Sequence, residues 1–390
     1  MNLINFLNNL IQHDGFILID SKSNKYVIGK PIKEKPIILK LLDKSLNYKL
    51  LLYPDLYFGE AYTNGSLVIE NGTITEFLDI VLKNIGKKHI NIYSKIFNKL
   101  KGTYKHLTNF NKGIKSKQNV AHHYDISEKL YDLFLDLNRQ YSCAYFKNES
   151  DTLEEAQNNK IDHIIKKLNI KPNQKVLDIG SGWGTLAINI AQKTKASVTG
   201  ITLSENQLEF SKNKVKELNL GNQVDFKLLD YRDLNEKYDH VASIEMIEAV
   251  GEKYMDQYFG TIKNVLNYGG TAAIQGIVIK DDLFERYRAN EDFIQKYIFP
   301  GGFLPSIQFM ENLIKKNDLK LEKINTYSDD YARTLATWRK NFLGAWEKIS
   351  PLGFDEYFKR MWEFYLSYCE AGFKSKNINL IQFSMSNKEI

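Results

Sequence analysis

The chain of 390 residues is 43% hydrophobic and 26% charged, a composition typical of a folded globular protein that excludes an intrinsically disordered one. No apolar run approaches the ~20 residues of a membrane-spanning helix, and Met1–Ile11 lacks the basic start and continuous apolar segment of a secretory signal. Two cysteines, Cys143 and Cys369, are too few for a disulfide framework, and no cysteine–histidine cluster has zinc spacing, so we expect a reducing, cytoplasmic setting.

Residues 1–82 predict a small α+β domain. Leucine and isoleucine recur at helical spacing over Met1–Ile11. Strand-like runs separated by asparagine-containing turn signals follow at Tyr26–Val27, Ile37–Leu42, Tyr48–Leu52 and Ser66–Glu70. A helix capped by Thr73 or Thr75 is then expected to run through Val81.

Residues 83–118 predict a basic amphipathic connector. From Ile80 to Tyr124 there is no Asp or Glu but there are ten lysines, which exceed the chain's net charge of +6 and leave the rest of the chain at −4. Apolar residues recur at helical spacing between Ile92 and Leu100. Such a helix suits an anionic membrane surface, and it equally suits a solvated linker packed on the next domain. Nucleic acid is not an expected partner, because no binding motif accompanies this confined charge.

Residues 119–390 predict an α/β domain with a doubly wound parallel sheet, because short apolar strands alternate with helices. The expected strands are Val176–Ile179, Ser197–Ile201, Val224–Leu229, Tyr238–Ser243 and Thr271–Gln275. The first strand leads through Gly180-Ser181-Gly182-Trp183-Gly184 into a helix near Thr185. Glycines in such a loop permit a tight turn and the close approach of a nucleotide.

A dinucleotide site begins similarly, but two features favour a different ligand. The loop spacing is G-x-G-x-G and not G-x-G-x-x-G, and the second strand ends in Gly200–Ser204 without a ribose-binding Asp or Glu, although Glu205 lies nearby. The loop resembles the S-adenosylmethionine loop of class I methyltransferases.

Further motifs extend that resemblance to one family. Tyr141–Tyr145, Ile247–Gly251, Gln275–Ile277 and Asp329–Leu335 follow one another as in the cyclopropane-fatty-acyl-phospholipid synthase family, which this chain resembles from about Asn119 to its end. The resemblance implies a Rossmann-like class I methyltransferase fold that uses S-adenosylmethionine. The donor-binding residues that it implies are Tyr141, Ser142, Asp178, Gly180, Gly182, Thr202, Leu203, Gln207, Tyr231 and Arg232.

The resemblance also implies a bound bicarbonate that serves as the base. The matching positions are Cys143, Glu248, Gln275, Ile277 and Tyr331. Gln275 stands where the family frequently has histidine; its amide can donate a hydrogen bond to an anion but cannot titrate near neutral pH. Glu245 competes with Glu248 for the carboxylate role, and the position in the motif favours Glu248.

Aromatic residues between Phe284 and Phe303, and on one helix face from Phe354 to Tyr368, suit either a protein core or a tunnel for an acyl chain. The implied reaction is transfer of a methylene group to the cis double bond of an unsaturated phospholipid acyl chain, giving a cyclopropane. The alternatives are a methylene- or methyl-branched product, another small acceptor, or lipid and donor binding without turnover. The resemblance further implies a peripheral membrane enzyme and a homodimer.

Overall fold

The computed structural model describes residues 2–84 and 128–388, and within them the chain forms two compact units. Of these residues, 2–84, 282–300 and 335–377 belong to the first unit, and 128–281, 301–334 and 378–388 belong to the second. Two segments of the predicted 119–390 domain, residues 282–300 and 335–377, therefore pack with the N-terminal residues. The predicted connector 83–118 lies almost wholly outside the described residues, so its helix stays a prediction.

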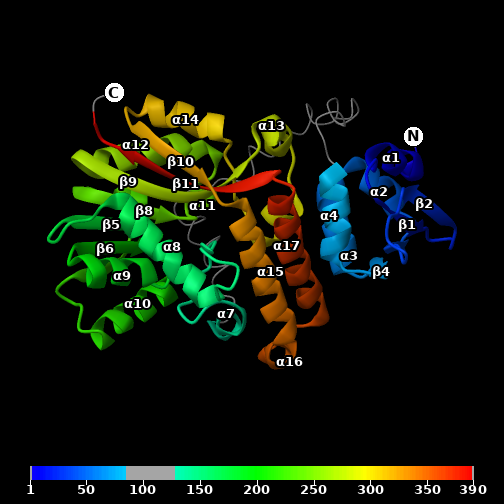
Figure 1. Cartoon of the computed structure of the whole chain (residues 1–390), viewed down its shortest axis with the longest axis horizontal. Helices are drawn as coiled ribbons and strands as arrows, with labels where there is room; N and C mark the ends of the chain where they lie inside the picture. The colour runs from blue at the N-terminus through cyan, green and yellow to red at the C-terminus, as the bar shows by residue number, and fades with distance from the viewer. Residues whose placement is uncertain (1, 85–127, 389–390) are drawn as a thin grey trace. The chain divides into compact units, whose positions relative to one another are not determined.

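The first unit contains a four-stranded sheet of order β2-β1-β3-β4. Its strands are β1 (Gly15–Ile19), β2 (Lys25–Gly29), β3 (Ile38–Leu41) and β4 (Leu67–Glu70). The long helix α17 (Glu356–Lys374) packs on α3 and α4 (Figure 1). The other helices are α1 (Leu3–Leu10), α2 (Leu46–Leu52), α3 (Pro54–Thr63), α4 (Ile74–Asn84), α13 (Asp281–Ala289), the π-helix η3 (Ile294–Ile298), α16 (Trp346–Ile349) and the 3₁₀ helix η4 (Ser350–Leu352).

Two predictions for this unit were wrong. The run Tyr48–Leu52, predicted as a strand, lies in α2, where Leu46 and Leu50 are buried at helical i, i+4 spacing. The apparent strand alternation arose because Tyr48 and Leu52 are exposed on the other side of that helix. The strand β1 was not predicted, because its continuous apolar run has no alternation to mark it.

The second unit is built on a seven-stranded sheet of order β10-β11-β9-β8-β5-β6-β7. Strands β7, β6, β5, β8 and β9 are parallel, and β11 is antiparallel to β9 and β10. The strands are β5 (Lys175–Ile179), β6 (Ser197–Thr202), β7 (Val224–Leu228), β8 (Tyr238–Ile244), β9 (Leu266–Ile279), β10 (Lys320–Thr326) and β11 (Ile378–Ser386). Each of the five strands expected from the sequence is present.

Helices cover both faces of this sheet, with α12 and α14 on one side and α9 and α10 on the other (Figure 1). The helices are α7 (Glu128–Phe134), α8 (Leu153–Leu168), α9 (Thr185–Thr194), α10 (Glu205–Glu217), η1 (Tyr231–Asp233), α11 (Ile247–Val250), η2 (Glu252–Tyr254), α12 (Met255–Val265), α14 (Ile307–Lys316) and α15 (Ser328–Gly344), which belongs to this unit as far as Thr334. Because β5, β6 and β8 are parallel, their carboxyl ends meet at one edge of the sheet.

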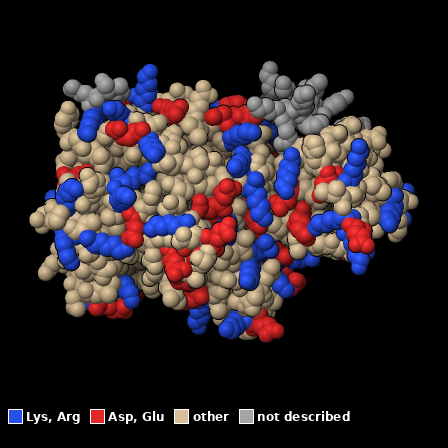
Figure 2. Space-filling model, in the orientation of Figure 1, with Lys and Arg blue, Asp and Glu red and all other residues tan. Residues whose placement is uncertain are grey.

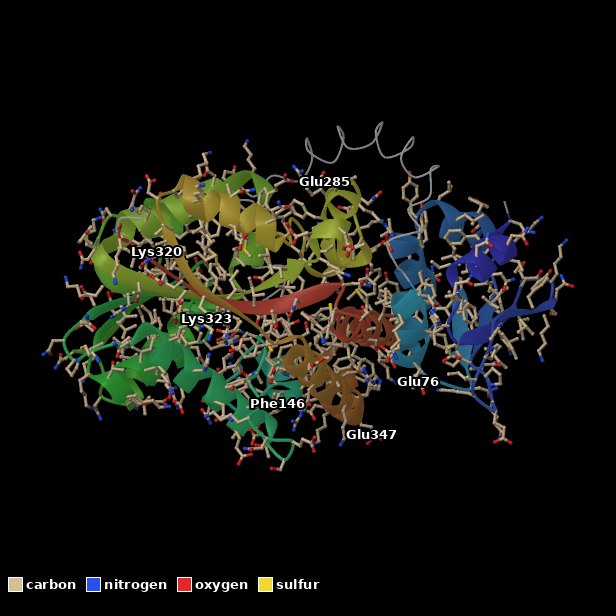
Figure 3. All side chains as sticks on the ribbon, turned by 45° about the horizontal axis from the view of Figure 1, so that its top comes forward. Glu76, Phe146, Glu285, Lys320, Lys323 and Glu347 are labelled. Atoms are coloured by element: carbon tan, nitrogen blue, oxygen red, sulfur yellow. The ribbon has the colours of Figure 1, made fainter. Side chains whose placement is uncertain are left out.

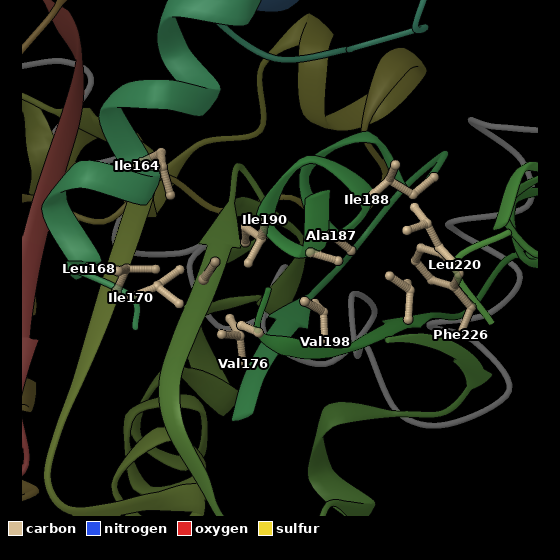
Figure 4. Packing of buried hydrophobic residues seen from close by; sticks show 14 of the residues in the cluster. Ile164, Leu168, Ile170, Val176, Ala187, Ile188, Ile190, Val198, Leu220 and Phe226 are labelled. Atoms are coloured by element: carbon tan, nitrogen blue, oxygen red, sulfur yellow. The ribbon is translucent and has the colours of Figure 1, made fainter. Parts of the chain in front are cut away.

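The core beneath that edge holds the strands in place (Figure 4). Side chains from β5, β6 and β7 pack against α8, α9 and the end of α10; Val176, Ala187 and Ile190 are fully buried. Gly200 is required here, because a Cβ on it would lie 2.4 Å from the Phe226 ring. The ring thus packs directly on the backbone of β6.

Shortening one core side chain should produce a small but measurable loss. Ile190→Val is expected to lower the free energy of unfolding by about 0.5–1.5 kcal/mol, because one buried methylene leaves a gap that the packed core fills only in part. Urea unfolding of the whole chain would measure it. Ile32→Val is the matched control, since Ile32 is 80% exposed and should give no change. An equal shift in both variants would contradict the packing argument.

The surface carries mixed charge, and basic and acidic side chains are intermingled on the face drawn in Figure 2. The edge strand β10 presents Lys320 and Lys323 to solvent (Figure 3), which discourages pairing with another sheet edge. Among the described residues, every helix is too short or too polar to cross a membrane.

Candidate active site

The glycine loop turns the chain from β5 into α9 beside the end of β6. The backbone N–H groups of Gly180 and Ser181 donate to the carbonyl oxygen of Ile201, at 3.0 and 2.9 Å. Gly180 has φ +77°, and a Cβ there would lie 2.9 Å from the Met246 side chain, so glycine is required. Gly182 has φ +53° with no atom within 4 Å of its would-be Cβ, which leaves room for a ligand beside the backbone.

A cavity of about 200 Å³, the loop cavity, lies at the glycine loop. Its wall is completed by residues from segments 139–142, 201–207, 229–232 and 244–250 and by α8. The structure brings together in this wall all the residues expected to bind the donor: Tyr141, Ser142, Asp178, Gly180, Gly182, Thr202, Leu203, Gln207, Tyr231 and Arg232. Their binding role stays a prediction, but their convergence on one cavity meets its geometric requirement.

Asp178, near the end of β5, is the acidic group of the loop cavity. Its side chain is 2% exposed, and its Oδ2 atom is buried with no hydrogen-bond partner among the described residues. Burial raises the pKa of the Asp178 carboxyl to about 7. An unpaired buried carboxyl is costly unless a cation or N–H donor completes it, so a cationic ligand fits this position.

The other polar groups of the wall are held in fixed positions. Thr202 Oγ1 donates to Gln207 Oε1 at 2.8 Å, which ties the end of β6 to the start of α10. Arg232 forms an ion pair with Asp230 at 2.5 Å. Tyr231 both lines the cavity and packs edge-to-face on another tyrosine, so its predicted binding role and its structural role coexist.

Lys160 of α8 is a cavity residue that the sequence did not single out. It is 4% exposed, and its Nζ donates to Ser142 Oγ at 2.7 Å and to Gln157 Oε1 at 2.6 Å. Burial lowers the pKa of Lys160, and the charge of Glu245 counteracts that shift. The sequence did offer a sign of this burial, because Lys160 lies on the same face of the expected helix as Ala156 and Ile164. A charged side chain on an apolar helix face is buried only when it has a polar partner.

Glu245, directly after β8, joins three of the residues predicted to be catalytic. Its Oε1 accepts hydrogen bonds from the backbone N–H of Cys143 at 2.8 Å and from Gln275 Nε2 at 2.6 Å. Its Oε2 accepts a hydrogen bond from the Tyr331 hydroxyl at 2.5 Å. Glu245 lines the loop cavity and has φ +50°, a conformation that non-glycine residues rarely adopt and that is often found at functional sites.

Glu248, the carboxylate that the motif favoured, has a different partner. Its Oε1 accepts a hydrogen bond from the backbone N–H of Ile277 at 2.5 Å, and its Oε2 is buried without a partner among the described residues. Burial, and then the charge of Glu245, raise the pKa of Glu248 well above the usual range of a glutamate, which favours its protonated form. Glu248 lies beside Glu245 but does not line the loop cavity.

The Cys143 side chain has a local role. It is 1% exposed and its thiol donates to the Ala144 carbonyl at 3.1 Å, while burial raises its pKa. The contact with Glu245 is made by its backbone N–H. Gln275 is fully buried and oriented at both ends: Nε2 donates to Glu245, and Oε1 accepts from Gln382 Nε2 at 2.8 Å. An amide supplies both interactions at once.

The segment that carries Tyr141 and Cys143 is anchored to the start of α15. The backbone N–H of Phe146 donates to Asp330 at 2.7 Å, and that of Ala144 donates to Thr334 Oγ1 at 3.1 Å. The Arg333 guanidinium lies 3.9 Å from the ring centroid of Phe146, which Figure 3 labels. These contacts fix the segments from which the Cys143 backbone donates to Oε1 and the Tyr331 hydroxyl donates to Oε2 of Glu245.

The residues expected to hold bicarbonate do not fit that anion. Cys143, Gln275 and Tyr331 donate to Glu245, and the Ile277 backbone donates to Glu248. The protein's own carboxylates therefore occupy the expected donors. In the described part of the chain, no three His, Cys, Asp or Glu side chains cluster as a metal site would require.

The aromatic segments expected to line a tunnel pack mainly with one another. Phe293 lies 4.8 Å from Phe364 between ring centroids, and Phe358 stacks on Trp362 at 5.2 Å within the first unit. None of these residues lines the loop cavity. The core interpretation therefore explains these contacts, and an acyl tunnel stays a prediction.

Comparisons with known proteins identify the family of this chain. The family model described as mycolic acid cyclopropane synthetase matches residues 111–383. Tuberculostearic acid methyltransferase UfaA1 of Mycobacterium tuberculosis is 37% identical over 278 residues, which cover 69% of this chain and 65% of that protein. Cyclopropane-fatty-acyl-phospholipid synthase of Escherichia coli K12 is 38% identical over 265 residues, which cover 68% of this chain and 66% of that protein. The chain thus spans about two thirds of each relative.

A solved structure gives the same result for the fold. Mycolic acid cyclopropane synthase CmaA1, solved in complex with SAH and CTAB, is 29% identical with a TM-score of 0.65, covering 69% of this chain and 98% of that chain. The predicted Rossmann-like methyltransferase fold is therefore confirmed. Since the family model also matches well over half of its residues, this chain belongs to the mycolic acid cyclopropane synthetase family.

Proposed function

We propose that the chain is an S-adenosylmethionine-dependent methyltransferase that alkylates the cis double bond of an unsaturated acyl chain in a phospholipid. The observation that carries this proposal is that the glycine loop, the unpaired Asp178 carboxyl and Glu245, which accepts hydrogen bonds from Cys143, Gln275 and Tyr331, all line one cavity. A nucleotide-type donor and a base for carbon chemistry are thereby brought to the same place.

The donor site fits S-adenosylmethionine. Its sulfonium and ammonium groups are cationic, and Asp178 is a buried carboxyl that lacks a partner. The space beside the Gly182 backbone can accept the amino-acid end of the donor. Thr202 and Tyr231 line the part of the cavity that we assign to the nucleoside. The donor supplies an electrophilic methyl group when bound.

Alkylation of an alkene requires a site with properties like those found around Glu245. An alkene that attacks the methyl group becomes a carbocation, which must be kept from water, stabilised by nearby negative charge and then deprotonated. Glu245 is half-buried, and hydrogen bonds from Cys143, Gln275 and Tyr331 hold its carboxylate in position on the cavity wall. Loss of the proton from the transferred methyl group would close a cyclopropane ring, which is the product we propose.

A methylene-branched product is the second candidate. One relative at 37% identity is named a tuberculostearic acid methyltransferase, while the Escherichia coli relative is named a cyclopropane-fatty-acyl-phospholipid synthase. Both products need the same donor and begin from the same cation. Loss of a methyl proton from that cation closes the ring, whereas the methylene branch needs a hydride to move first from the methylated carbon to the cationic carbon, after which loss of a methyl proton gives the C=CH2 group.

The phospholipid substrate, the membrane surface and a homodimer remain parts of the proposal. The lysine-rich stretch 83–117, whose composition suits anionic lipid headgroups, supports the membrane surface, and the name of the Escherichia coli relative supports the phospholipid. The homodimer rests on the family resemblance alone. Peripheral attachment at the cytoplasmic face would present the acyl chains to the enzyme without a membrane-spanning helix.

Incubation with lipid would test this function. Purified protein, S-adenosylmethionine and vesicles of cis-monounsaturated phosphatidylglycerol should give fatty acids heavier by one CH2, with upfield ring protons in the NMR spectrum. The same mass gain with vinylidene protons would establish the branched product instead. Donor binding without any lipid product would refute the proposed acceptor, and the free unsaturated fatty acid is the control for the headgroup requirement.

A further inference from the structure

The Glu245 carboxylate occupies the place of an exchangeable anion. Three donors from distant parts of the chain converge on it: the Cys143 backbone, the Gln275 amide and the Tyr331 hydroxyl, at 2.8, 2.6 and 2.5 Å. Exposed turn carboxylates such as Asp20 also accept several hydrogen bonds, but from neighbours within six residues, whereas the donors to Glu245 come from 30 to 102 residues away. Donors gathered from distant segments around one negative charge are the arrangement expected of an anion-binding site.

A free anion in this place would meet unfavourable charge. Glu245 already accepts the donors, and Glu248 accepts the remaining backbone N–H, that of Ile277, at 2.5 Å. A bicarbonate ion would lie close to the Glu245 carboxylate, where like charges repel, and these four donors already have acceptors. The site is therefore complete without an added anion.

Side chains near Glu245 favour its ionised form, as a fixed negative group of the site requires. Lys160 lies near enough to stabilise the ionised form of Glu245 electrostatically, whereas burial and the charge of Glu245 raise the pKa of Glu248 and disfavour its ionised form. The three donors also favour the ionised form, while burial raises the pKa of Glu245 above its ordinary value, which makes the carboxylate a stronger base.

We propose that the Glu245 carboxylate is the base of the reaction and replaces bicarbonate, so that turnover requires no dissolved anion. This inference rests on the proposed function, because it assigns the proton acceptor for that chemistry. The π electrons of the acyl double bond form the new C–C bond as the methyl–sulfur bond breaks, leaving S-adenosylhomocysteine and a cation on the acyl chain. A C–H bond of the transferred methyl then supplies the pair that closes the ring, and its proton goes to Glu245 and afterwards to water.

Three variants separate this role from a structural one. Glu245→Gln keeps the shape but removes the charge. Glu245→Gly removes the side chain at φ +50°, where glycine is unstrained, and leaves the three donors facing an opening that an anion could enter. Asp318→Gly is the matched control, because Asp318 is also an acidic residue with left-handed backbone, φ +52°, but is exposed and outside the cavity.

The rates should be measured in buffer freed of carbon dioxide and again with added bicarbonate. We expect wild type and Asp318→Gly to turn over equally in both. Glu245→Gln should fall by about 100-fold or more in both, as for loss of a general base. Glu245→Gly should fall similarly without bicarbonate and recover by about tenfold or more with it. A wild-type rate that depends on bicarbonate, full activity of Glu245→Gln, or no recovery of Glu245→Gly would overturn the proposal.

A binding measurement keeps this test independent of the proposed function. Carbon-13 bicarbonate should show exchange broadening with Glu245→Gly but not with wild type, whether or not either protein acts on lipid. If wild type forms no lipid product at all, the proposed function fails. The binding measurement then still tests whether the Glu245 side chain occupies the position that bicarbonate would take. Bicarbonate binding to wild type would overturn the inference, and binding only to the glycine variant would support it.

Discussion

Asp178→Asn is expected to weaken binding of S-adenosylmethionine by about tenfold to 100-fold, because a hydrogen bond to a charged group contributes about 1.5–3 kcal/mol. Asparagine keeps the shape of the side chain but cannot pair with the cationic donor. Isothermal titration with S-adenosylhomocysteine, whose ammonium group is retained, would measure the loss. Asp162→Asn is the control, since Asp162 is half-exposed and pairs with Lys193 at the surface.

The same variant has a pH signature. The pKa of Asp178 is raised to about 7 in the folded protein, so wild-type donor affinity should fall as the pH drops below 7 and the carboxylate is neutralised. The stability contributed by the proton on Asp178 is present below the unfolded pKa and is lost as pH rises through 7. Asp178→Asn should therefore remove the pH dependence of affinity and raise the unfolding temperature of the donor-free protein at pH 8. A lowered unfolding temperature would show instead that Asp178 is structural.

Tyr331→Phe is expected to lower kcat by about tenfold to 100-fold with little change in donor affinity, because it removes the hydroxyl that donates to Glu245 at 2.5 Å. Losing that donor makes ionisation of Glu245 less favourable, which raises its pKa. Since the base acts in its ionised form, the acid limb of the kcat–pH profile should move to higher pH. Steady-state rates between pH 5 and 9 with vesicles would reveal both effects.

Tyr327→Phe is the matched control for that variant. Tyr327 lies just before α15 and its hydroxyl lies 3.1 Å from His163 Nε2, away from the loop cavity. Its loss should leave kcat and the acid limb unchanged. An unchanged kcat in Tyr331→Phe, or equal losses in both tyrosine variants, would mean that the hydroxyl of Tyr331 does not act through Glu245.

The donor half of the site could be predicted because its residues are contiguous with strands. Asp178 and Gly180 end β5, Thr202 ends β6 and Tyr231 follows β7, and in a parallel sheet all these ends meet at one edge. Alternation of helices and strands thus determined both the fold class and the position of the loop cavity. Local sequence was sufficient because parallel pairing of these strands brings their carboxyl ends together at one edge of the sheet.

The choice between Glu245 and Glu248 could not be made in the same way. They are three residues apart in one motif, and either could have faced the cavity. The backbone at Glu245 adopts a left-handed conformation that no local pattern announces, and its partners Gln275 and Tyr331 lie 30 and 86 residues along the chain. Only packing of β8 against β9, and of the start of α15 nearby, decides which carboxylate receives the donors.

The division into units shows the same limit. Sequence placed everything after Asn119 in one domain, but residues 282–300 and 335–377 pack with the N-terminal segments, where Phe293 meets Gly59 and Phe364. Sequence by itself determined the alternation of helices and strands and the position of the glycine loop, since these depend on short-range patterns of apolar residues and glycine. Tertiary structure alone decided the hydrogen-bond partners of Glu245, the burial of Lys160 and the partners of the aromatic segments, since each depends on contacts between residues far apart in the chain.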